Sequence, residues 1–481
     1  MNIEMISILN LIRTPKINVK PDSAAIISND TEITYSELES LIKKTSYGLT
    51  EVGVKENDLV TLLFENNTDC IVVVPALWQI GAVPVPLNIK LLEKDLNEQI
   101  DFLQPGLTLR SKKFKDVNLR GKVSTFPKLT FPDNNEEIII KNFSKDTTAL
   151  ILFTSGSSGK PKAVMLTFDN LIQSALIGNK VLNHTSEDKW LASLPFYHIG
   201  GFSIIFRALM FGSSVIVPES LSNDDLLESI KTHKPTLASV VSSQLKYFLD
   251  KDFIPPEELR TVLLGGGFAD KELIFKAMNN GWKIAKVYGS TETSSFVSFM
   301  NTTEVYNKPG ASGKIIPPNE IKITVEREVI VKSPSIMKGY FNNEQETFSK
   351  LKNGFYQTGD LGFIDNEGYL FIESKRDDLI ITGGENVNPV EVEKTILLNT
   401  KVKEVCVTGL DDSQWGQVIF AAVVLNENTD MTENELKLFL KDKISSFKIP
   451  KRFILIDHLP KSELGKVYRK QVKDMLSPIH P

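Results

Sequence analysis

Cysteine is scarce in this sequence. The 481 residues include only two cysteines, Cys70 and Cys406, and five histidines. Two thiols so far apart argue against a disulfide framework and against a cysteine-based metal site. We expect both to be buried thiols of a protein from a reducing compartment. No internal repeat or low-complexity segment is present.

An excess of one charge and a long hydrophobic run are also missing. Lys and Arg number 55 against 60 Asp and Glu, with no basic stripe, so the sequence predicts no nucleic-acid partner. The most apolar run, residues 71–87, contains Pro75 and Pro84 and predicts a buried helix followed by a strand rather than a membrane span. Residues 1–20 carry Glu4 before any basic residue and do not resemble a signal peptide. We therefore expect a cytoplasmic protein without integral membrane association.

Alternating helix and strand patterns dominate the first two thirds of the chain. A chain of this length is expected to form roughly two to four folding units. An amphipathic segment over 36–52 precedes an apolar strand over 58–64, and repetition of such units predicts an α/β fold with a mainly parallel sheet. Further strands are expected at 149–153, 214–217, 261–264, 321–325, 329–332, 368–372, 405–407 and 420–425.

The pattern changes in the last third. A strand-rich stretch before Arg376 predicts a small β subdomain, and a compact α+β pattern follows it. We place a domain boundary at Asp377. Residues 1–376 are then a large N-terminal region of α/β subdomains plus the β subdomain, which binds ATP and the acid. Residues 377–481 are a small, mobile α+β C-terminal domain.

The first stretch with recognisable chemistry directly follows the strand at 149–153. It reads Thr154, Ser155, Gly156, Ser157, Ser158, Gly159, Lys160. Glycines and small hydroxylated residues let backbone N–H groups wrap a polyphosphate, and Lys160 supplies positive charge. The spacing is not that of the P-loop G-x-x-x-x-G-K-[ST], because Pro161 keeps Lys160 from continuing into a helix. Composition alone leaves a flexible surface turn as the alternative.

The same stretch resembles the phosphate loop of the adenylate-forming superfamily, which contains acyl-CoA synthetases, luciferases and peptide-synthetase adenylation domains. Four further stretches resemble motifs of this superfamily in the same order. They are residues 288–293 (YGSTET), 356–360 (YQTGD), 378–391 (DLIITGGENVNPVE, the hinge and glycine loop) and 460–469 (PKSELGKVYR). The motifs span most of the chain, so the chain is identified as a member of the superfamily.

The resemblance implies a role for each motif. Residues 154–160 hold the leaving pyrophosphate, Glu292 binds Mg²⁺, and Asp360 holds the ribose hydroxyls of ATP. Lys466 is the catalytic lysine that reaches the reacting carboxylate and the α-phosphate, and Asp377 is the hinge. The remaining cofactor-binding residues that the resemblance implies are Gly265, Gly266, Gly267, Tyr288, Gly289, Thr291, Lys375, Gly383 and Gly384.

Several of these residues have a plainer alternative. Mg²⁺ prefers carboxylate oxygens beside phosphates, but Glu292 is also explained as a charge at a helix N-terminus. Asp360 is also explained as a turn former, Tyr288 as a core residue and Lys466 as a solvated surface charge. Lys375 stands where the superfamily usually has an arginine, so that ribose contact lacks the guanidinium fork.

Residues 194–202 resemble the motif that closes over the acyl substrate. This implies His198 as a catalytic and substrate-binding residue, with Gly200 and Gly201 in the same pocket. Within the superfamily, the short overall length and the stretches 198–203, 264–267 and 383–386 most resemble the o-succinylbenzoate-CoA ligases of menaquinone biosynthesis. Their substrate has a second carboxylate, which Arg207 would bind. A surface or interdomain salt bridge is the alternative for Arg207.

The sequence thus predicts an acid-thiol ligase, an AMP-forming acyl-CoA synthetase that uses ATP, Mg²⁺ and coenzyme A. Its remaining partner is a small carboxylic acid. Carboxylates are poor electrophiles, and activating one through a phosphoryl donor requires cations that neutralise developing charge. Two alternatives stay open: another acyl- or aryl-CoA synthetase of the fatty acid or benzoate type, and a non-catalytic nucleotide-binding homologue.

Overall fold

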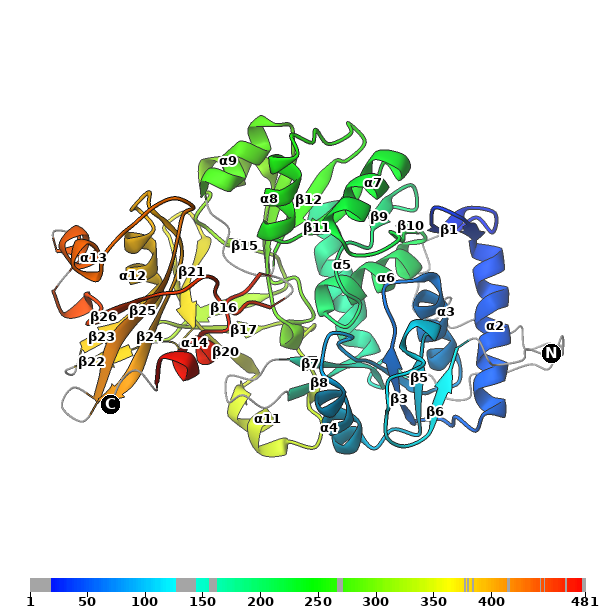
Figure 1. The fold of residues 1–481 in the computed structure, drawn as a ribbon. Helices are drawn as coiled ribbons and strands as arrows, with labels where there is room; N and C mark the ends of the chain where they lie inside the picture. Colours follow the sequence, from blue (N-terminus) through cyan, green and yellow to red (C-terminus); the bar gives the residue numbers. More distant parts are fainter. Residues whose placement is uncertain are drawn as a thin grey trace. The chain divides into compact units, whose positions relative to one another are not determined.

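The computed structural model consists of two compact units, which are described separately (Figure 1). Unit 1 comprises residues 1–320 and 331–356, and unit 2 comprises residues 321–330 and 357–481. The predicted boundary residue Asp377 is not among the residues described, and the division at that residue stays a prediction. The structure describes residues 19–126, 144–154, 162–265, 271–375, 378, 380–382, 385–412, 416–441, 443–444, 446–462 and 465–477.

A twisted sheet with a parallel centre dominates unit 1. Its parallel strands lie in the order β13 (Ile284–Tyr288), β12 (Thr261–Leu264), β11 (Leu237–Val240), β9 (Lys189–Leu191), β10 (Ser214–Ile216) and β1 (Ala24–Ile27). Antiparallel strands extend it on both sides: β2 (Glu32–Thr34), β14 (Ser298–Met300) and β15 (Gly313–Ile315). The carboxyl ends of the parallel strands share one edge, which is where α/β sheets bind their ligands.

Helices connect these strands. They are α5 (Phe168–Leu182), α6 (Ile199–Phe211), α7 (Asn223–His233), α8 (Ser242–Asp250), α9 (Lys271–Asn279) and α10 (Thr302–Asn307). Figure 1 shows α5 and α6 side by side. Thr167 and Asn170 form a capping box at the start of α5, and α6 ends where Gly212 adopts a left-handed φ of 72°. The predicted alternation of strand and helix is confirmed here.

A second, smaller parallel sheet belongs to the same unit. Its strands lie in the order β4 (Val83–Pro86), β3 (Leu59–Leu63), β5 (Leu107–Arg110) and β6 (Val123–Thr125). The helices of this part are α2 (Tyr35–Glu51), α3 (Thr68–Gln79) and α4 (Glu93–Leu103). The apolar run 71–87 forms a buried helix and a strand, as predicted. No helix among the described residues is long and apolar enough to cross a membrane.

Trp78 of α3 packs against helices α5 and α6. Its ring lies 5.5 Å from that of Phe168, 6.1 Å from that of Phe202 and 5.8 Å from that of Phe206, all edge-on. Its indole N–H donates a hydrogen bond of 2.7 Å to the Ala149 carbonyl. A buried tryptophan with its polar group satisfied contributes both apolar contact and fixed orientation. Helices α5 and α6 are thereby held against α3.

Three antiparallel strands stand apart from both sheets. Strand β7 (Thr148–Thr154) pairs with β8 (Lys162–Thr167), and β8 pairs with β18 (Gly339–Tyr340), which precedes α11 (Glu344–Lys350). The sequence predicts mainly parallel pairing for this region, and that prediction is wrong for β7. Residues 155–161 are too few for the crossover of about a dozen residues that a parallel pair needs. The chain therefore returns as a hairpin.

Unit 2 contains the β-rich stretch predicted before Arg376. Its strands lie in the order β16 (Glu320–Ile323), β17 (Glu328–Lys332), β20 (Phe355–Ile364) and β21 (Tyr369–Lys375). Strand β19 (Leu351–Lys352) belongs to unit 1 and pairs there with Phe355 and Tyr356, the first two residues of β20. The predicted small β subdomain is present.

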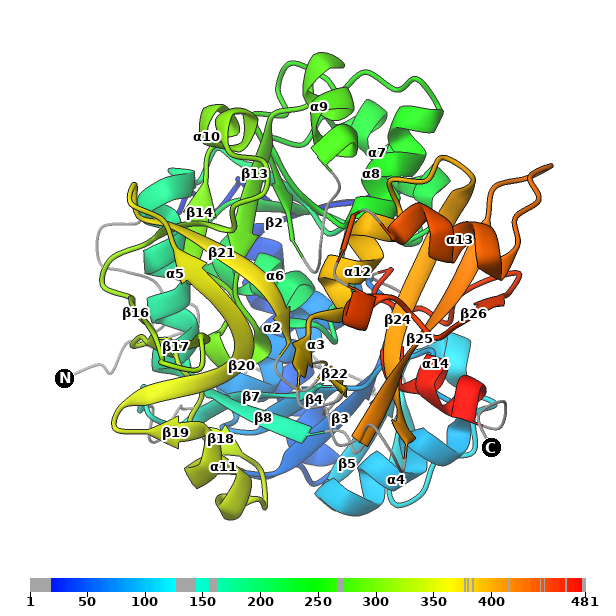
Figure 2. The same ribbon diagram turned by 90° about the vertical axis from the view of Figure 1, so that its left-hand side faces the viewer.

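A five-stranded sheet forms the rest of unit 2. Its strands are β22 (Ile380–Thr382), β23 (Glu385–Val387), β24 (Val402–Asp412), β25 (Gly416–Leu425) and β26 (Arg452–Leu455). Alternating side chains of β24 and β25 form two cores. One includes α12 (Pro389–Ile396) and α13 (Glu433–Leu440), and the other includes α14 (Arg469–Leu476) (Figure 2). Cys406 lies in the α14 core and Cys70 in α3, both free and buried as predicted.

Candidate active site

The predicted phosphate loop joins the antiparallel strands β7 and β8. Thr154 and Lys162 lie opposite each other at the end of this hairpin, and the Thr154 hydroxyl donates a hydrogen bond of 3.4 Å to the Lys162 carbonyl. Both ends of the loop are therefore fixed on adjacent strands. The loop residues Ser155, Gly156, Ser157, Ser158, Gly159 and Lys160 lie outside the described residues.

Tyr340 connects the base of this loop to Glu292. Its hydroxyl donates a hydrogen bond of 3.2 Å to Glu292 Oε1, and the Lys162 ammonium lies 5.4 Å from the centre of its ring. Lys162 also forms an ion pair with Glu346 of α11. Burial raises the pKa of Tyr340, and the Glu292 carboxylate raises it further, so the phenol remains a donor at neutral pH. Two predicted motifs far apart in sequence meet at this tyrosine.

Glu292 fits the role of a magnesium ligand. It lies in a single 3-10 turn, Thr291–Thr293, and its carbonyl accepts a hydrogen bond of 2.8 Å from Met337 N–H. A turn of three residues has little helix dipole, which argues against the helix-terminus alternative. The part of the chain that the structure describes holds no group of three His, Cys, Asp or Glu for a metal. Mg²⁺ commonly uses one or two carboxylates plus substrate phosphates, so one carboxylate near a phosphate loop suffices.

The predicted cofactor-binding residues Gly265 and Tyr288, which would form the adenine pocket, lie on neighbouring strands at the carboxyl edge of the main sheet. Gly265 follows β12, Tyr288 ends β13, and these strands are parallel neighbours. Tyr288 is half-buried and is not part of the buried core. A Cβ added to Gly289 would lie 1.2 Å from the Ser295 carbonyl oxygen, so the backbone packing here requires glycine. Gly266 and Gly267 lie outside the described residues.

Asp360 lies within strand β20 and not in a turn, so the turn-former alternative is wrong. It is buried, and its N–H donates a hydrogen bond of 2.9 Å to the Thr358 hydroxyl. Gly359 before it has a left-handed φ of 72°. Lys375 lies directly opposite Asp360 in the β20–β21 pairing, so the register brings together the two residues predicted at the ribose. Asp377, Gly383 and Gly384 lie outside the described residues.

His198 is the residue before α6, in the loop that leaves β9 at the carboxyl edge of the main sheet. Its carbonyl accepts a hydrogen bond of 3.0 Å from Gly201 N–H, and its half-buried ring lies 4.7 Å from the Tyr197 ring. A Cβ on Gly201 would lie 2.1 Å from the Pro195 carbonyl oxygen, and one on Gly200 would also be crowded. The glycines let the start of α6 pack tightly under this loop.

Arg207 is 3% exposed, so a surface salt bridge is the wrong explanation for it. Its guanidinium donates hydrogen bonds of 3.1 Å to the Ser203 hydroxyl and 3.3 Å to the Ser174 hydroxyl, and it lies 4.5 Å from the centre of the Phe296 ring. Within the described residues its Nε has no hydrogen-bond partner. Burial lowers the pKa of Arg207 to about 9, which still leaves a buried cation at neutral pH.

Lys466 is exposed and belongs to a closed loop of unit 2. Lys461 and Val467 form a β-bridge at its base. Ser462 N–H donates a hydrogen bond of 2.7 Å to the Lys466 carbonyl, and Lys466 N–H donates one of 3.1 Å to the Ser462 hydroxyl. Gly465 has a left-handed φ of 75°. Hydrogen bonds thus hold the described ends of this loop together, and Lys466 is exposed, which suits both the catalytic role and the surface alternative.

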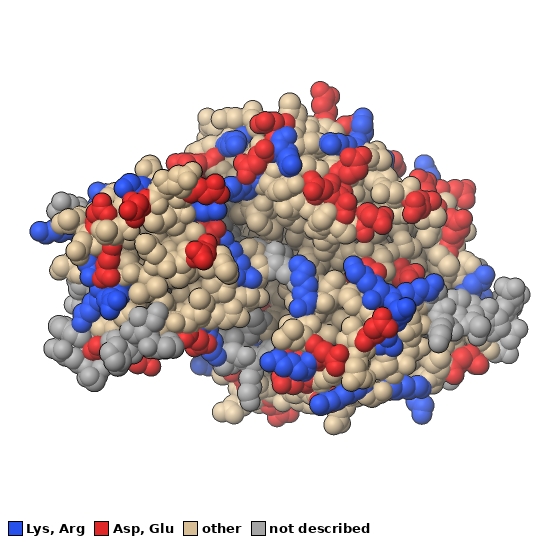
Figure 3. All heavy atoms as spheres, viewed as in Figure 1, with Lys and Arg blue, Asp and Glu red and all other residues tan. Residues whose placement is uncertain are grey.

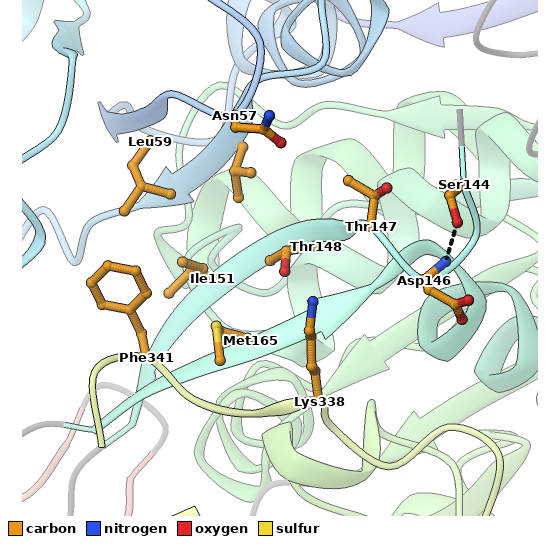
Figure 4. Close-up of a pocket in the computed structure, with 11 residues that line it drawn as sticks. Asn57, Leu59, Ser144, Asp146, Thr147, Thr148, Ile151, Met165, Lys338 and Phe341 are labelled. Carbon is orange, nitrogen blue, oxygen red and sulfur yellow. Dashed lines mark hydrogen bonds between the residues drawn. The ribbon is translucent and has the colours of Figure 1, made fainter. Parts of the chain in front are cut away.

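A pocket of about 380 Å³ lies beside the β7–β8 hairpin (Figure 4). Leu59, Ile151, Met165 and Phe341 form its apolar side, and Lys338, whose N–H donates a hydrogen bond of 2.9 Å to the Met165 carbonyl of β8, contributes a basic side chain. None of the described residues that line it is a predicted site residue.

A larger pocket of about 970 Å³ lies in unit 2, lined by α13, β25, β26 and the segment before β26. Val418 and Phe420 contribute apolar surface. Its basic residues are Lys437, Lys441, Lys451 and Arg452. On the face shown in Figure 3, by contrast, acidic and basic side chains are interspersed without a continuous basic band.

Sequence reasoning did not assign roles to Tyr340, Lys162 or Glu346. The only sequence signal was the position of Lys162 directly after the phosphate loop. Tyr340 and Glu292 are 48 residues apart, and their contact depends on the pairing of β18 with β8.

The antiparallel phosphate-loop hairpin, the nucleotide motifs at one sheet edge and the lysine loop of unit 2 define the chain as an adenylate-forming enzyme. The AMP-binding enzyme family matches residues 15–341, and the AMP-binding enzyme C-terminal domain matches residues 391–466. The chain belongs to the AMP-binding enzyme family, and the resemblance seen in its motifs is confirmed.

Comparison with individual relatives shows which members of the family the chain resembles. The chain is 33% identical over 462 residues to the 2-succinylbenzoate–CoA ligase of Listeria monocytogenes, covering 95% of this chain and 98% of that protein. Its fold matches o-succinylbenzoate CoA synthetase of Bacillus subtilis in complex with the acyl-adenylate intermediate, with a TM-score of 0.87, 33% identity and coverage of 94% and 96% of the two chains. The same Bacillus enzyme with ATP and magnesium ion gives a TM-score of 0.86 at 33% identity, over 94% and 97% of the chains.

Proposed function

We propose that this enzyme is the ATP-dependent ligase that converts 2-succinylbenzoate to 2-succinylbenzoyl-CoA, a step of menaquinone biosynthesis. The similarity over 95% of the chain to a 2-succinylbenzoate–CoA ligase carries this proposal. The contact of Tyr340 with both Glu292 and Lys162 supports the use of ATP, since it places the proposed magnesium ligand next to the phosphate-loop hairpin. Two buried free cysteines and the use of ATP and CoA suit a cytoplasmic enzyme.

The reaction proceeds in two steps. A carboxylate oxygen first attacks the α-phosphorus of ATP, and the bond to the bridging oxygen breaks with release of pyrophosphate. The thiol sulfur of CoA then attacks the acyl carbon and loses its proton to solvent, and AMP leaves with the electron pair of the broken C–O bond. Bound Mg²⁺, held by Glu292, would supply neutralising charge at the phosphates. Lys466 would bring a cation to the carboxylate and the α-phosphate.

The basic pocket of unit 2 suits the phosphate groups of CoA. It combines apolar surface for a nucleotide with lysines that attract phosphate. We assign this pocket to CoA binding.

Loss of one pocket lysine should weaken CoA binding alone. Lys441→Gln and Lys451→Gln are each expected to raise the KM for CoA about fivefold, because an exposed ion pair is worth up to about 1 kcal/mol. Steady-state kinetics with varied CoA measure this, and pyrophosphate release in the adenylation step should not change. Lys473→Gln, outside the pocket on α14, is the matched control. An unchanged KM for CoA in both pocket variants would refute the assignment.

Arg207 supplies the best candidate for recognising the second carboxylate of the acid. It is a buried cation without an acidic partner among the described residues, on helix α6, whose first turn contains Gly200 and Gly201. Ser203 connects Arg207 to the first turn of the helix. Its hydroxyl donates a hydrogen bond of 3.2 Å to the Gly200 carbonyl and accepts one from Arg207. A carboxylate reaching this helix would therefore find a preformed donor.

Replacing Arg207 should lower the activity toward diacids but not toward monoacids. Arg207→Leu is expected to lower kcat/KM for 2-succinylbenzoate by roughly tenfold to a hundredfold, since a charged hydrogen bond contributes about 1.5–3 kcal/mol. A monoacid of similar shape without the ring carboxylate should react at an unchanged rate, which also serves as the control for folding. Equal loss with both acids would make Arg207 purely structural.

The rival substrates are fatty and benzoic acids. Pyrophosphate release by the wild-type enzyme across a panel of such acids distinguishes them from 2-succinylbenzoate. A preference for a monoacid would overturn the assigned substrate but not the ligase chemistry. No ATP–pyrophosphate exchange with any acid would favour the non-catalytic alternative.

A further inference from the structure

Arg469 is the centre of a partly buried ion cluster in unit 2. It is the first residue of α14 and follows Lys466 by three positions. Its Nη1 donates hydrogen bonds to Glu393 Oε1 and to the Val407 carbonyl, and its Nη2 donates to Glu393 Oε2 at 3.3 Å. Its Nε lies 3.5 Å from Asp378 Oδ2. One guanidinium thus joins α12, β24, α14 and the segment at residue 378.

This cluster differs from the other ion pairs of the unit. The Arg469 and Glu393 side chains are only 19% and 14% exposed, whereas Asp411, paired with Lys473, is 84% exposed. Two-pronged arginine–carboxylate pairs are geometrically specific, and partial burial shields them from salt. Glu393 is held in turn, because its Oε1 accepts a hydrogen bond of 2.7 Å from Val407 N–H. The cluster therefore fixes positions rather than merely adding surface charge.

The cluster lies at the base of the Lys466 loop. Tyr468, immediately before Arg469, donates a backbone hydrogen bond of 2.9 Å to the Pro460 carbonyl and closes the loop. Asp378, which also belongs to the cluster, directly follows the predicted hinge residue Asp377 in sequence. Arg469 is thus the residue that connects the chain next to the hinge with the chain next to the catalytic lysine.

We propose that Arg469 is a positioning residue, which holds the base of the lysine loop against Glu393 and Asp378 so that Lys466 is presented in one orientation. It touches no substrate and acts only through Lys466. This inference rests on the proposed function, because it concerns the adenylation step.

The test measures the two half-reactions separately in Arg469→Gln. The rate of adenylation is measured by ATP–pyrophosphate exchange with 2-succinylbenzoate. It is expected to fall roughly tenfold to a hundredfold, since a displacement of a catalytic group by about 1 Å can cost a hundredfold in rate. The KM for ATP should not change. Conversion of supplied acyl-adenylate plus CoA should also be unchanged, because Lys466 is not needed there. Glu393→Gln should show a smaller loss in the same direction.

Action through Lys466 is tested by combining the changes. In the Lys466→Ala background, Arg469→Gln is expected to cause no further loss of adenylation, because the lysine that it positions is already gone. Independent, multiplicative losses would overturn the proposal.

Val472→Ala is the control for stability. Val472 is buried on the same helix but takes no part in the ion cluster, so this variant should lower the melting temperature without favouring one half-reaction over the other. If Arg469→Gln instead slows both half-reactions equally, Arg469 has only a structural role. Failure of the wild-type enzyme to adenylate 2-succinylbenzoate would instead refute the substrate, and the same variants would be compared with the acid that it does activate.

Discussion

Lys466→Ala is expected to slow formation of the acyl-adenylate by on the order of a hundredfold to a thousandfold, the usual cost of removing one group that stabilises developing charge. The carboxylate and the α-phosphate are both negative, so their approach requires a cation. Once the adenylate exists, attack by CoA does not need this charge. Supplying preformed acyl-adenylate and CoA to the variant should therefore give product at nearly the wild-type rate.

The measurement is ATP–pyrophosphate exchange for the first step and thioester formation for the second. Lys470→Ala removes an exposed lysine four positions away on α14 and is expected to leave both rates unchanged. Normal adenylation by Lys466→Ala would mean that this lysine is a solvated surface charge, the alternative that its exposure leaves open.

Local patterns predicted much of the fold. The amphipathic segment expected over 36–52 is helix α2, Tyr35–Glu51, and the strand expected at 261–264 is β12 with the same bounds. Both follow from short-range spacing of apolar residues, which the helical or extended backbone places on one face. The order of the motifs was also sufficient to identify the family, because each motif is a short continuous stretch.

Pairing between distant segments could not be predicted in this way. The antiparallel return of β7 depends on the length of the loop after it, which strand propensity does not reveal. Arg469 and Glu393 are 76 residues apart, and Tyr340 and Glu292 are 48 apart, so no local pattern signals either contact. Such contacts are set by packing of the finished fold.

The burial of single charged residues could not be predicted from the sequence either. Arg207 is the only charged residue in the apolar segment 199–211, and an arginine is ordinarily exposed, so the sequence left a salt bridge open as the alternative. It is buried because Ser174 and Ser203 supply hydroxyl acceptors and Phe296 supplies an aromatic face. None of these neighbours except Ser203 is close in sequence. Its role at the acid is therefore argued from burial and not from position in a motif.

Asp377→Pro is expected to leave acyl-adenylate formation nearly intact while reducing thioester formation by roughly a hundredfold. One active site that performs two different reactions has to present different groups in each, and hinge residues absorb the backbone change. Proline fixes φ near −65°, and a conformation that conflicts with it is disfavoured by about 3 kcal/mol, which corresponds to about a hundredfold in population. We expect the adenylating state to be the one that survives, because the substitution leaves the phosphate loop unchanged.

Asp377→Ala is the matched control, since alanine removes the carboxylate but keeps φ free, and it should support both steps. Asp378→Ala is a second control: it removes the ion pair with Arg469 without restricting the backbone, so any loss should fall on adenylation instead. The two half-reactions are measured as for Lys466. Equal loss of both steps in Asp377→Pro would show that residue 377 is needed for folding and that the two reactions do not depend on a hinge there.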